Sequence, residues 1–145
     1  MKYETVTFKS KDGTGLHGWF VPATGNAAGT VIHFNGNAQN MSAHFSFVAW
    51  LPTQGFNVFA FDYRGYGRSG GKLTRKGVHA DAITALKQLK TRKDTHQDRL
   101  FVLGQSLGGA VAIRAVADAK VTGIRGIVVE STFNSYKSIA RDKGP

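Results

Sequence analysis

Polar and apolar residues alternate along the first part of the chain in the pattern of β-strands. Residues 3–9 alternate between polar and apolar side chains, which is typical of a strand with one buried face. Residues 16–21 form a second such segment after a turn at Asp12-Gly13, so the two predict a β-hairpin. The runs at 30–34 and 57–61 are almost wholly apolar, and they predict strands that are buried on both faces.

Apolar residues at helical spacing come between the later strands. Residues 41–51 are rich in large apolar side chains at that spacing and predict a first helix. A second helix is predicted to begin after Thr74, and a third covers Leu107 to Ala119. Two further apolar strands, residues 100–103 and 124–129, lie on either side of this third helix.

A hairpin followed by alternating strands and helices predicts the α/β class, with a mostly parallel sheet and helices on both faces. The 145 residues have a hydrophobic content of 41% and a charged content of 19%, as in globular proteins. Neither an internal repeat nor a linker divides them. We therefore expect a single domain over residues 1–145.

The strongest chemical signal is the segment GQSLG, which joins the predicted strand at 100–103 to the third helix. Serine becomes a nucleophile only with an exposed oxygen, a base and donors for the developing oxyanion. A Gly-x-Ser-x-Gly turn between strand and helix exposes the serine, here Ser106, because Gly104 and Gly108 let the two elements pass closely. Gly109 adds further room, and the N–H of Leu107 is the expected oxyanion donor. The alternative is a packing turn in which Ser106 only caps the helix.

A second oxyanion donor is expected from the loop that follows the strand at 30–34, which reads HFNGNAQN. Gly36 would let the backbone approach a substrate oxygen, with the N–H of Asn37 or Ala38 as the donor. His33, beside this loop, is expected to be a buried structural histidine rather than a catalytic one.

Three motifs in this order resemble the α/β-hydrolase superfamily, and within it the serine aminopeptidase- and esterase-like branch: HFNGNAQN, FDYRGYGRS and GQSLGG. The segment VESTFNSY also resembles that branch, so the resemblance covers nearly the whole chain. It implies cleavage of an ester, thioester or amide through an acyl-enzyme on Ser106. Asn35 stands where the branch usually has histidine; since the donors are backbone N–H groups, we expect an intact oxyanion hole in a loop that is held differently.

The resemblance also implies an acid and then a histidine after the serine. All five histidines precede Ser106, and Glu130, at the end of the last predicted strand, is the candidate acid. We therefore expect an α/β-hydrolase fold truncated after the strand at 124–129, with little activity from this chain alone. The alternative is a non-catalytic fragment or assembly module. An open apolar edge at that strand predicts self-association.

The net charge of +10 raises the alternative of a nucleic-acid or anion binder, but no nucleic-acid motif accompanies it. A solvated basic face is the favoured interpretation, and no specific nucleic-acid partner is expected. The segment GYGRSG resembles a dinucleotide-binding motif, yet the helix begins only after it, so Asp62 and Arg64 are expected to brace a loop.

No cofactor and no metal are expected, because the chain has no cysteine and no histidine pair at metal-binding spacing. The expected partner is a small acyl substrate or a peptide. Neither a membrane-length apolar run nor an apolar signal core at the N-terminus is present, so the sequence predicts no membrane span and a cytoplasmic location.

Overall fold

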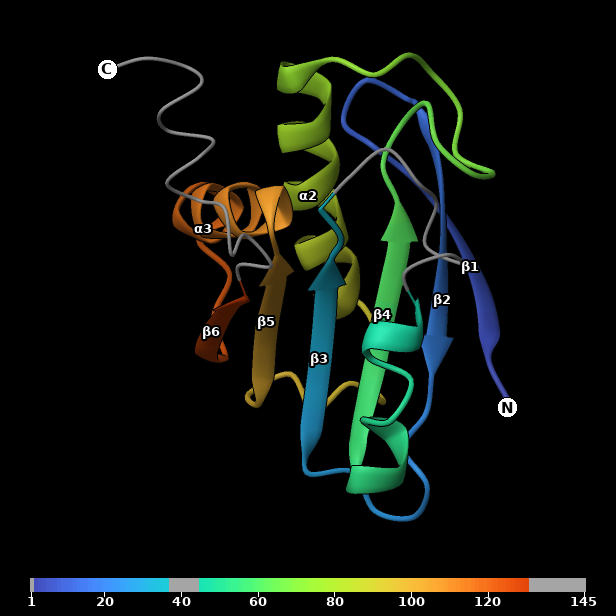
Figure 1. Ribbon diagram of the computed structural model, residues 1–145, viewed down its shortest axis with the longest axis vertical. Helices are drawn as coiled ribbons and strands as arrows, with labels where there is room; N and C mark the ends of the chain where they lie inside the picture. The colour runs from blue at the N-terminus through green and yellow to red at the C-terminus, as the bar shows by residue number, and fades with distance from the viewer. Residues whose placement is uncertain (1, 37–44, 131–145) are drawn as a thin grey trace.

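The computed structural model describes residues 2–36 and 45–130 (Figure 1). Six strands, two α-helices and two 3₁₀ helices make up this part of the chain. In chain order they are β1 (Glu4–Lys9), β2 (Gly15–Val21), β3 (Gly29–Phe34), η1 (Phe45–Phe47), η2 (Pro52–Gln54), β4 (Phe56–Asp62), α2 (Arg75–Lys90), β5 (Leu100–Gln105), α3 (Leu107–Ala119) and β6 (Ile124–Glu130).

The strands form one sheet in the order β1-β2-β4-β3-β5-β6. The hairpin of β1 and β2 pairs antiparallel with β4, whereas β4, β3, β5 and β6 run parallel. The predicted mostly parallel sheet of the α/β class is therefore confirmed. Because these four strands are parallel, the loops that follow them emerge at one edge, at the arrowheads in Figure 1.

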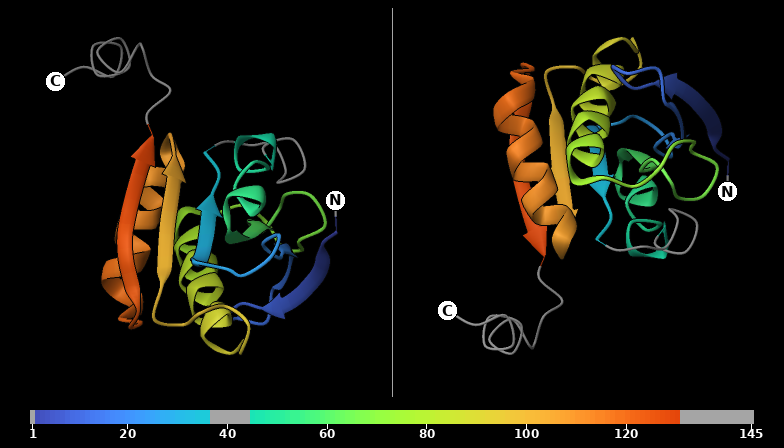
Figure 2. Two further views of the ribbon diagram at one scale, coloured as in Figure 1. Left: turned by 90° about the horizontal axis from the view of Figure 1, so that it is seen from below. Right: turned by 90° about the horizontal axis from the view of Figure 1, so that it is seen from above.

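Both α-helices cover one face of the sheet, and the two 3₁₀ helices cover the other (Figure 2). Beneath α2 and α3 the core is built from aromatic and aliphatic side chains of the central strands, among them Phe34, Phe59 and Phe61. The second face packs Val31 and Val58 under the residues of η1 and η2. Large apolar runs in the central strands are thus explained by burial on both sides.

The predicted helix over residues 41–51 is wrong for its described part. Residues 41–44 lie outside the described residues, and Phe45–Phe47 form a 3₁₀ helix followed by turns. Phe45, Val48 and Leu51 are buried; the N–H of Val48 donates to the carbonyl oxygen of Phe45, and the N–H of Leu51 donates to that of Val48. A spacing of three suits a 3₁₀ helix, in which such side chains share one face. A 3₁₀ helix and an α-helix both bury large apolar side chains on one face, so the same residues also fit the pattern of an α-helix.

The remaining elements lie close to their predicted positions. Helix α3 begins and ends where the sequence places it, and β5 continues to Gln105, two residues further than predicted. Within the described ranges, no helix combines the length and the apolar character that crossing a lipid bilayer requires.

Candidate active site

Ser106 lies in the sharp turn between β5 and α3. Its backbone has φ +58° and ψ −123°, a region that residues other than glycine rarely occupy. The side chain makes no capping hydrogen bond to α3, in contrast to Thr74 at the start of α2, whose hydroxyl accepts from the N–H of Gly77. The turn therefore does not fit the alternative in which Ser106 serves as a helix cap.

Backbone hydrogen bonds hold this turn from two sides. The N–H of Ser106 donates to the carbonyl oxygen of Glu130 over 2.7 Å, which ties the turn to the end of β6. The N–H of Gly109 donates to the carbonyl oxygen of Ser106 over 3.0 Å. An uncommon backbone conformation persists where its surroundings determine it in this way.

The glycines around Ser106 are required by close approach of backbone segments. A Cβ atom on Gly104 would lie 2.6 Å from the Cα of Gly109, and one on Gly108 would collide with the carbonyl oxygens of Phe34 and Asn35. Gly109 itself faces Val129 of β6. Strand β5, helix α3 and the end of β3 can meet here only because these positions lack side chains.

The loop after β3 starts directly beside the serine turn. A Cβ on Gly36 would collide with the carbonyl oxygen of Gln105 and lie 2.8 Å from the Cβ of Ser106. Asn37 and Ala38, the expected donors of the second oxyanion N–H, lie outside the described residues. The described part of this loop, which ends at Gly36, therefore lies beside the serine turn. The N–H donors of Asn37 and Ala38 stay a prediction.

Asn35, which stands where the resembled branch usually has histidine, is held by groups at the end of β4 and directly after it. The Tyr63 hydroxyl donates to the Asn35 carbonyl oxygen over 3.1 Å, and the Asn35 side-chain amide donates to the Phe61 carbonyl oxygen over 3.5 Å. Burial, together with the nearby charge of Asp81, raises the pKa of Tyr63 far above its ordinary value, so this hydroxyl remains a donor. Tyr63 belongs to the motif FDYRGYGRS, but the sequence assigned it no role.

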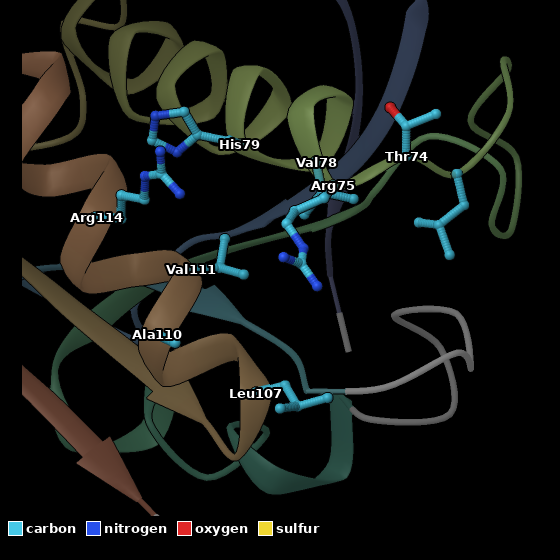
Figure 3. Close-up of a pocket in the computed structure, with 9 residues that line it drawn as sticks. Thr74, Arg75, Val78, His79, Leu107, Ala110, Val111 and Arg114 are labelled. Carbon is cyan, nitrogen blue, oxygen red and sulfur yellow. The ribbon is translucent and has the colours of Figure 1, made fainter. Parts of the chain in front are cut away.

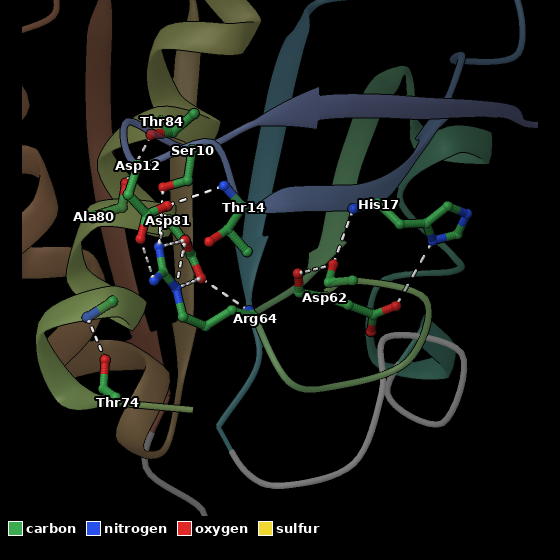
Figure 4. Close-up of polar contacts among 12 residues, drawn as sticks. Ser10, Asp12, Thr14, His17, Asp62, Arg64, Thr74, Ala80, Asp81 and Thr84 are labelled. Carbon is green, nitrogen blue, oxygen red and sulfur yellow. Dashed lines mark hydrogen bonds and ion pairs between the residues drawn. The ribbon is translucent and has the colours of Figure 1, made fainter. Parts of the chain in front are cut away.

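The loop after β4 is held by charged side chains (Figure 4). The buried Arg64 guanidinium pairs with Asp81 of α2 over 2.8 Å and with Asp12 of the first hairpin over 2.7 Å. Hydrogen bonds from Arg64 hold the pKa of Asp12 well below its usual range, and the two carboxylates raise the pKa of Arg64. Arg64 thus braces the loop, as the sequence suggested, while its partner Asp81 had not been recognised.

Two of the described histidines lie in the sheet, away from Ser106. His33 is 2% exposed, and its register partner on β5 is Leu103, three residues or about 10 Å before the serine. His17, whose Nδ1 is 3.7 Å from Asp62 Oδ2, belongs to β2, which is separated from β5 by three strand spacings or about 14 Å.

The other two described histidines are His79, on α2 against the far end of α3, and His96, before the start of β5. His79 Nε2 is 2.8 Å from Asp118 Oδ2, but Asp118 is twelve residues along α3, about 18 Å from Ser106. His96 precedes β5, and six strand residues separate that end from the serine turn. His44 lies outside the described residues. Among the residues that the structure describes, no histidine is therefore positioned as the base for Ser106.

A groove begins next to the serine turn and runs between α2 and α3 (Figure 3). Its volume is about 560 Å³, and its first wall residue at the turn is Leu107. The other large side chains along it are Leu73, Val78, Val111, Arg75, His79 and Arg114. This groove was not predicted, because its two walls are separate helices. No group of three or more potential metal ligands occurs in the described ranges.

The family model of serine aminopeptidase S33 matches residues 25–141. This chain belongs to the serine aminopeptidase S33 family of the α/β hydrolases. The uncharacterized protein YfhR of Escherichia coli K12 is 46% identical over 146 residues, which are 98% of this chain and 51% of that protein. The α/β hydrolase domain-containing protein WAV2 of Arabidopsis thaliana is 34% identical and aligns with 95% of this chain and 45% of its own length.

Solved structures agree with this assignment. An esterase of Pyrococcus furiosus, Pf2001, superposes with a TM-score of 0.72 at 32% identity, over 83% of this chain and 49% of the esterase. The chain spans about half the length of the relatives it matches.

Proposed function

We propose that Ser106 is the nucleophile of a serine hydrolase that cleaves an ester, or a thioester or amide, through an acyl-enzyme. The observation that carries this proposal is the backbone of Ser106, which is held in an uncommon conformation while its side chain caps nothing. The esterase activity in the name of the Pyrococcus furiosus relative favours an ester among the three substrate classes.

The proposed reaction is ordinary acyl transfer. Ser106 Oγ attacks the carbonyl carbon while its proton passes to a base, and the N–H groups of Leu107 and of Asn37 or Ala38 stabilise the oxyanion. The leaving group departs with that proton, which leaves the acyl group on Ser106, and water then releases the acid. The exposed N-terminus of α3 supports the role of Leu107, because its first N–H groups need partners outside the helix.

The base and the acid are proposed separately. The described histidines lie too far from Ser106, so we assign the base to residues outside the described ranges. For the acid we retain Glu130, because its carbonyl oxygen already bonds to Ser106 at the end of β6. Replacing Glu130 by Gln is then expected to slow turnover of the whole protein without loss of folding.

A fluorophosphonate reagent tests the nucleophile directly. We expect slow labelling of one serine in the 145-residue chain, read by intact mass, and faster labelling when imidazole is added as a diffusible base. Ser106→Ala should abolish the label, whereas Ser46→Ala, at an exposed serine of η1, should leave it unchanged.

A folded chain that takes no label at any imidazole concentration would contradict the proposal. It would favour the second candidate function, a non-catalytic module that has kept the turn but not its chemistry. The observation behind that candidate is the absence of a positioned base among the described residues.

For the chain by itself we also propose self-association through β6. This strand pairs only with β5 among the described residues, yet Ile127, Val128 and Val129 are all exposed. An apolar strand edge recruits another strand. Analytical ultracentrifugation should show a dimer or larger species that Val128→Lys disperses, whereas Thr5→Lys on the opposite edge strand should not. A monomer at all concentrations would refute this proposal.

A cytoplasmic location remains a prediction of the sequence, which cell fractionation would test.

A further inference from the structure

The groove between α2 and α3 begins beside Ser106. Leu107, which follows the proposed nucleophile, forms its end at the serine turn. Arg114 lies seven residues further along α3, about 10 Å away along the helix axis. An extended ligand about 10 Å long therefore fits along α3 with one end at the serine turn (Figure 3).

Large apolar side chains line the groove although water reaches them. Leu107 is 64% exposed and Leu73, across from it, is 50% exposed. Val78 and Val111 continue the apolar surface along the two helices. Outside β6, few large apolar residues of the described chain are exposed to this degree. Exposed apolar surface in a concave site is typical of ligand binding.

Two arginines of the groove wall have no carboxylate partner among the described residues. Arg75 extends from α2 toward the Leu107 end of the groove, and Arg114 extends from α3 on the side of His79, which pairs with Asp118 (Figure 3). Neither has an ion pair among the described residues, whereas Arg64 and Arg92 each pair with two carboxylates. No aspartate or glutamate is among the groove's wall residues. An apolar groove with unpaired arginines fits a ligand that is apolar along its length and anionic at one point.

We propose that the groove binds an alkyl chain that carries a carboxylate. This proposal rests on the proposed function and narrows it: the preferred substrate is an ester whose acyl chain ends in a free carboxylate. The ester carbonyl lies at Ser106, the chain lies over Leu107 and Val111, and the carboxylate is bound by Arg114, while Arg75 supplies a second positive charge nearer the serine turn. We choose the carboxylate over a second copy of the chain because a surface of the same positive charge would be repelled.

Binding can be measured without turnover in a Ser106→Ala chain. The probes are monomethyl decanedioate, which has one free carboxylate, and dimethyl decanedioate, which is neutral and otherwise alike. In an NMR titration at low salt we expect the monoester to bind about fivefold more tightly, since two exposed ion pairs contribute modestly. The preference should shrink at high salt. The amide signals of Leu107 and Val111 should shift.

Arg75→Gln together with Arg114→Gln should remove the preference for the monoester. Lys87→Gln together with Lys93→Gln, an equal charge change at two exposed positions outside the groove, should leave it intact. Equal binding of the two probes, or a preference that survives the double variant, would overturn the inference. Tighter binding of decyl phosphate than of the monoester would overturn the choice of carboxylate.

The two proposals fail in distinguishable ways. If Ser106 takes no fluorophosphonate but the monoester preference depends on both arginines, the groove is a binding site and the hydrolase proposal is wrong. If Ser106 is labelled while the probes bind equally, the hydrolase proposal stands and the substrate class assigned here is wrong.

Discussion

Two loops leave the same edge of the sheet and are held in place by opposite means. The turn after β5 is fixed by the absence of side chains: Gly104, Gly108 and Gly36 allow backbone segments to touch. The loop after β4 is fixed by the presence of charged side chains, with Arg64 bound between Asp81 and Asp12. The serine turn depends on the space that side chains would occupy, and the loop after β4 depends on charge. Different perturbations should therefore affect the two.

The largest effect is expected from breaking the charged arrangement at Arg64. Arg64→Met leaves the fully buried Asp81 without its cation, and such a loss costs about 3 kcal/mol or more of unfolding free energy. Arg92→Met is the matched control, since its partners Glu4 and Asp94 are more than half exposed, and about 1 kcal/mol is expected. Urea denaturation gives both values.

The double variant Arg64→Met with Asp81→Leu shows whether the cost comes from the unpaired carboxylate. Part of the lost stability should return, because no buried charge then remains. Equal losses at Arg64 and Arg92 would mean that Arg64 acts only as a surface charge.

The next largest effect is expected from adding one methyl group to the serine turn. Gly108→Ala places a Cβ against the carbonyl oxygens of Phe34 and Asn35 and should cost about 2 kcal/mol. Gly126→Ala on β6 is the control, because its Cβ would find only ordinary contacts with Phe101. Its effect should stay within about 1 kcal/mol. A comparable cost at both glycines would contradict the steric account.

Acid should weaken the charged arrangement and spare the steric one. Hydrogen bonds from Arg64 lower the pKa of Asp12, and those from Arg92 lower the pKa of Glu4 and Asp94. A lowered pKa in the folded state adds stability above the unfolded value of about 4, and this stability is lost as the pH falls below it. The melting temperature should therefore fall between pH 5 and pH 3.

Asp12→Asn should make that decline shallower, since one of the contributing carboxylates is gone. Melting curves recorded at several pH values test this. An unchanged slope would show that Asp12 makes no difference to the acid sensitivity of the fold.

The smallest effect is expected at Ser106 itself. Ser106→Gly relieves the positive φ and should stabilise the fold by about 1 kcal/mol relative to Ser106→Ala, which keeps the conformation. Thermal unfolding of the two variants compares them directly. If Ser106→Gly were the less stable of the two, backbone strain in this turn would be negligible.

The sequence by itself determined the elements that follow from local periodicity and spacing. Helix α3 and the serine turn were predicted because an apolar strand, the small residues Gly104, Ser106 and Gly108, and a helical pattern follow one another in the sequence. The segment at 45–51 was misjudged, because a three-residue spacing of Phe45, Val48 and Leu51 differs little from an α-helical one over so short a length.

Only the tertiary structure decided which distant residues meet. The sheet order brings β3 between β4 and β5, and this places Gly36 and Tyr63 beside the serine turn. The pairing of Arg64 with Asp81, and the groove with Arg75 and Arg114, likewise join residues from separate elements. Side-chain periodicity reports which face of an element is buried, but it carries no record of the neighbour that buries it.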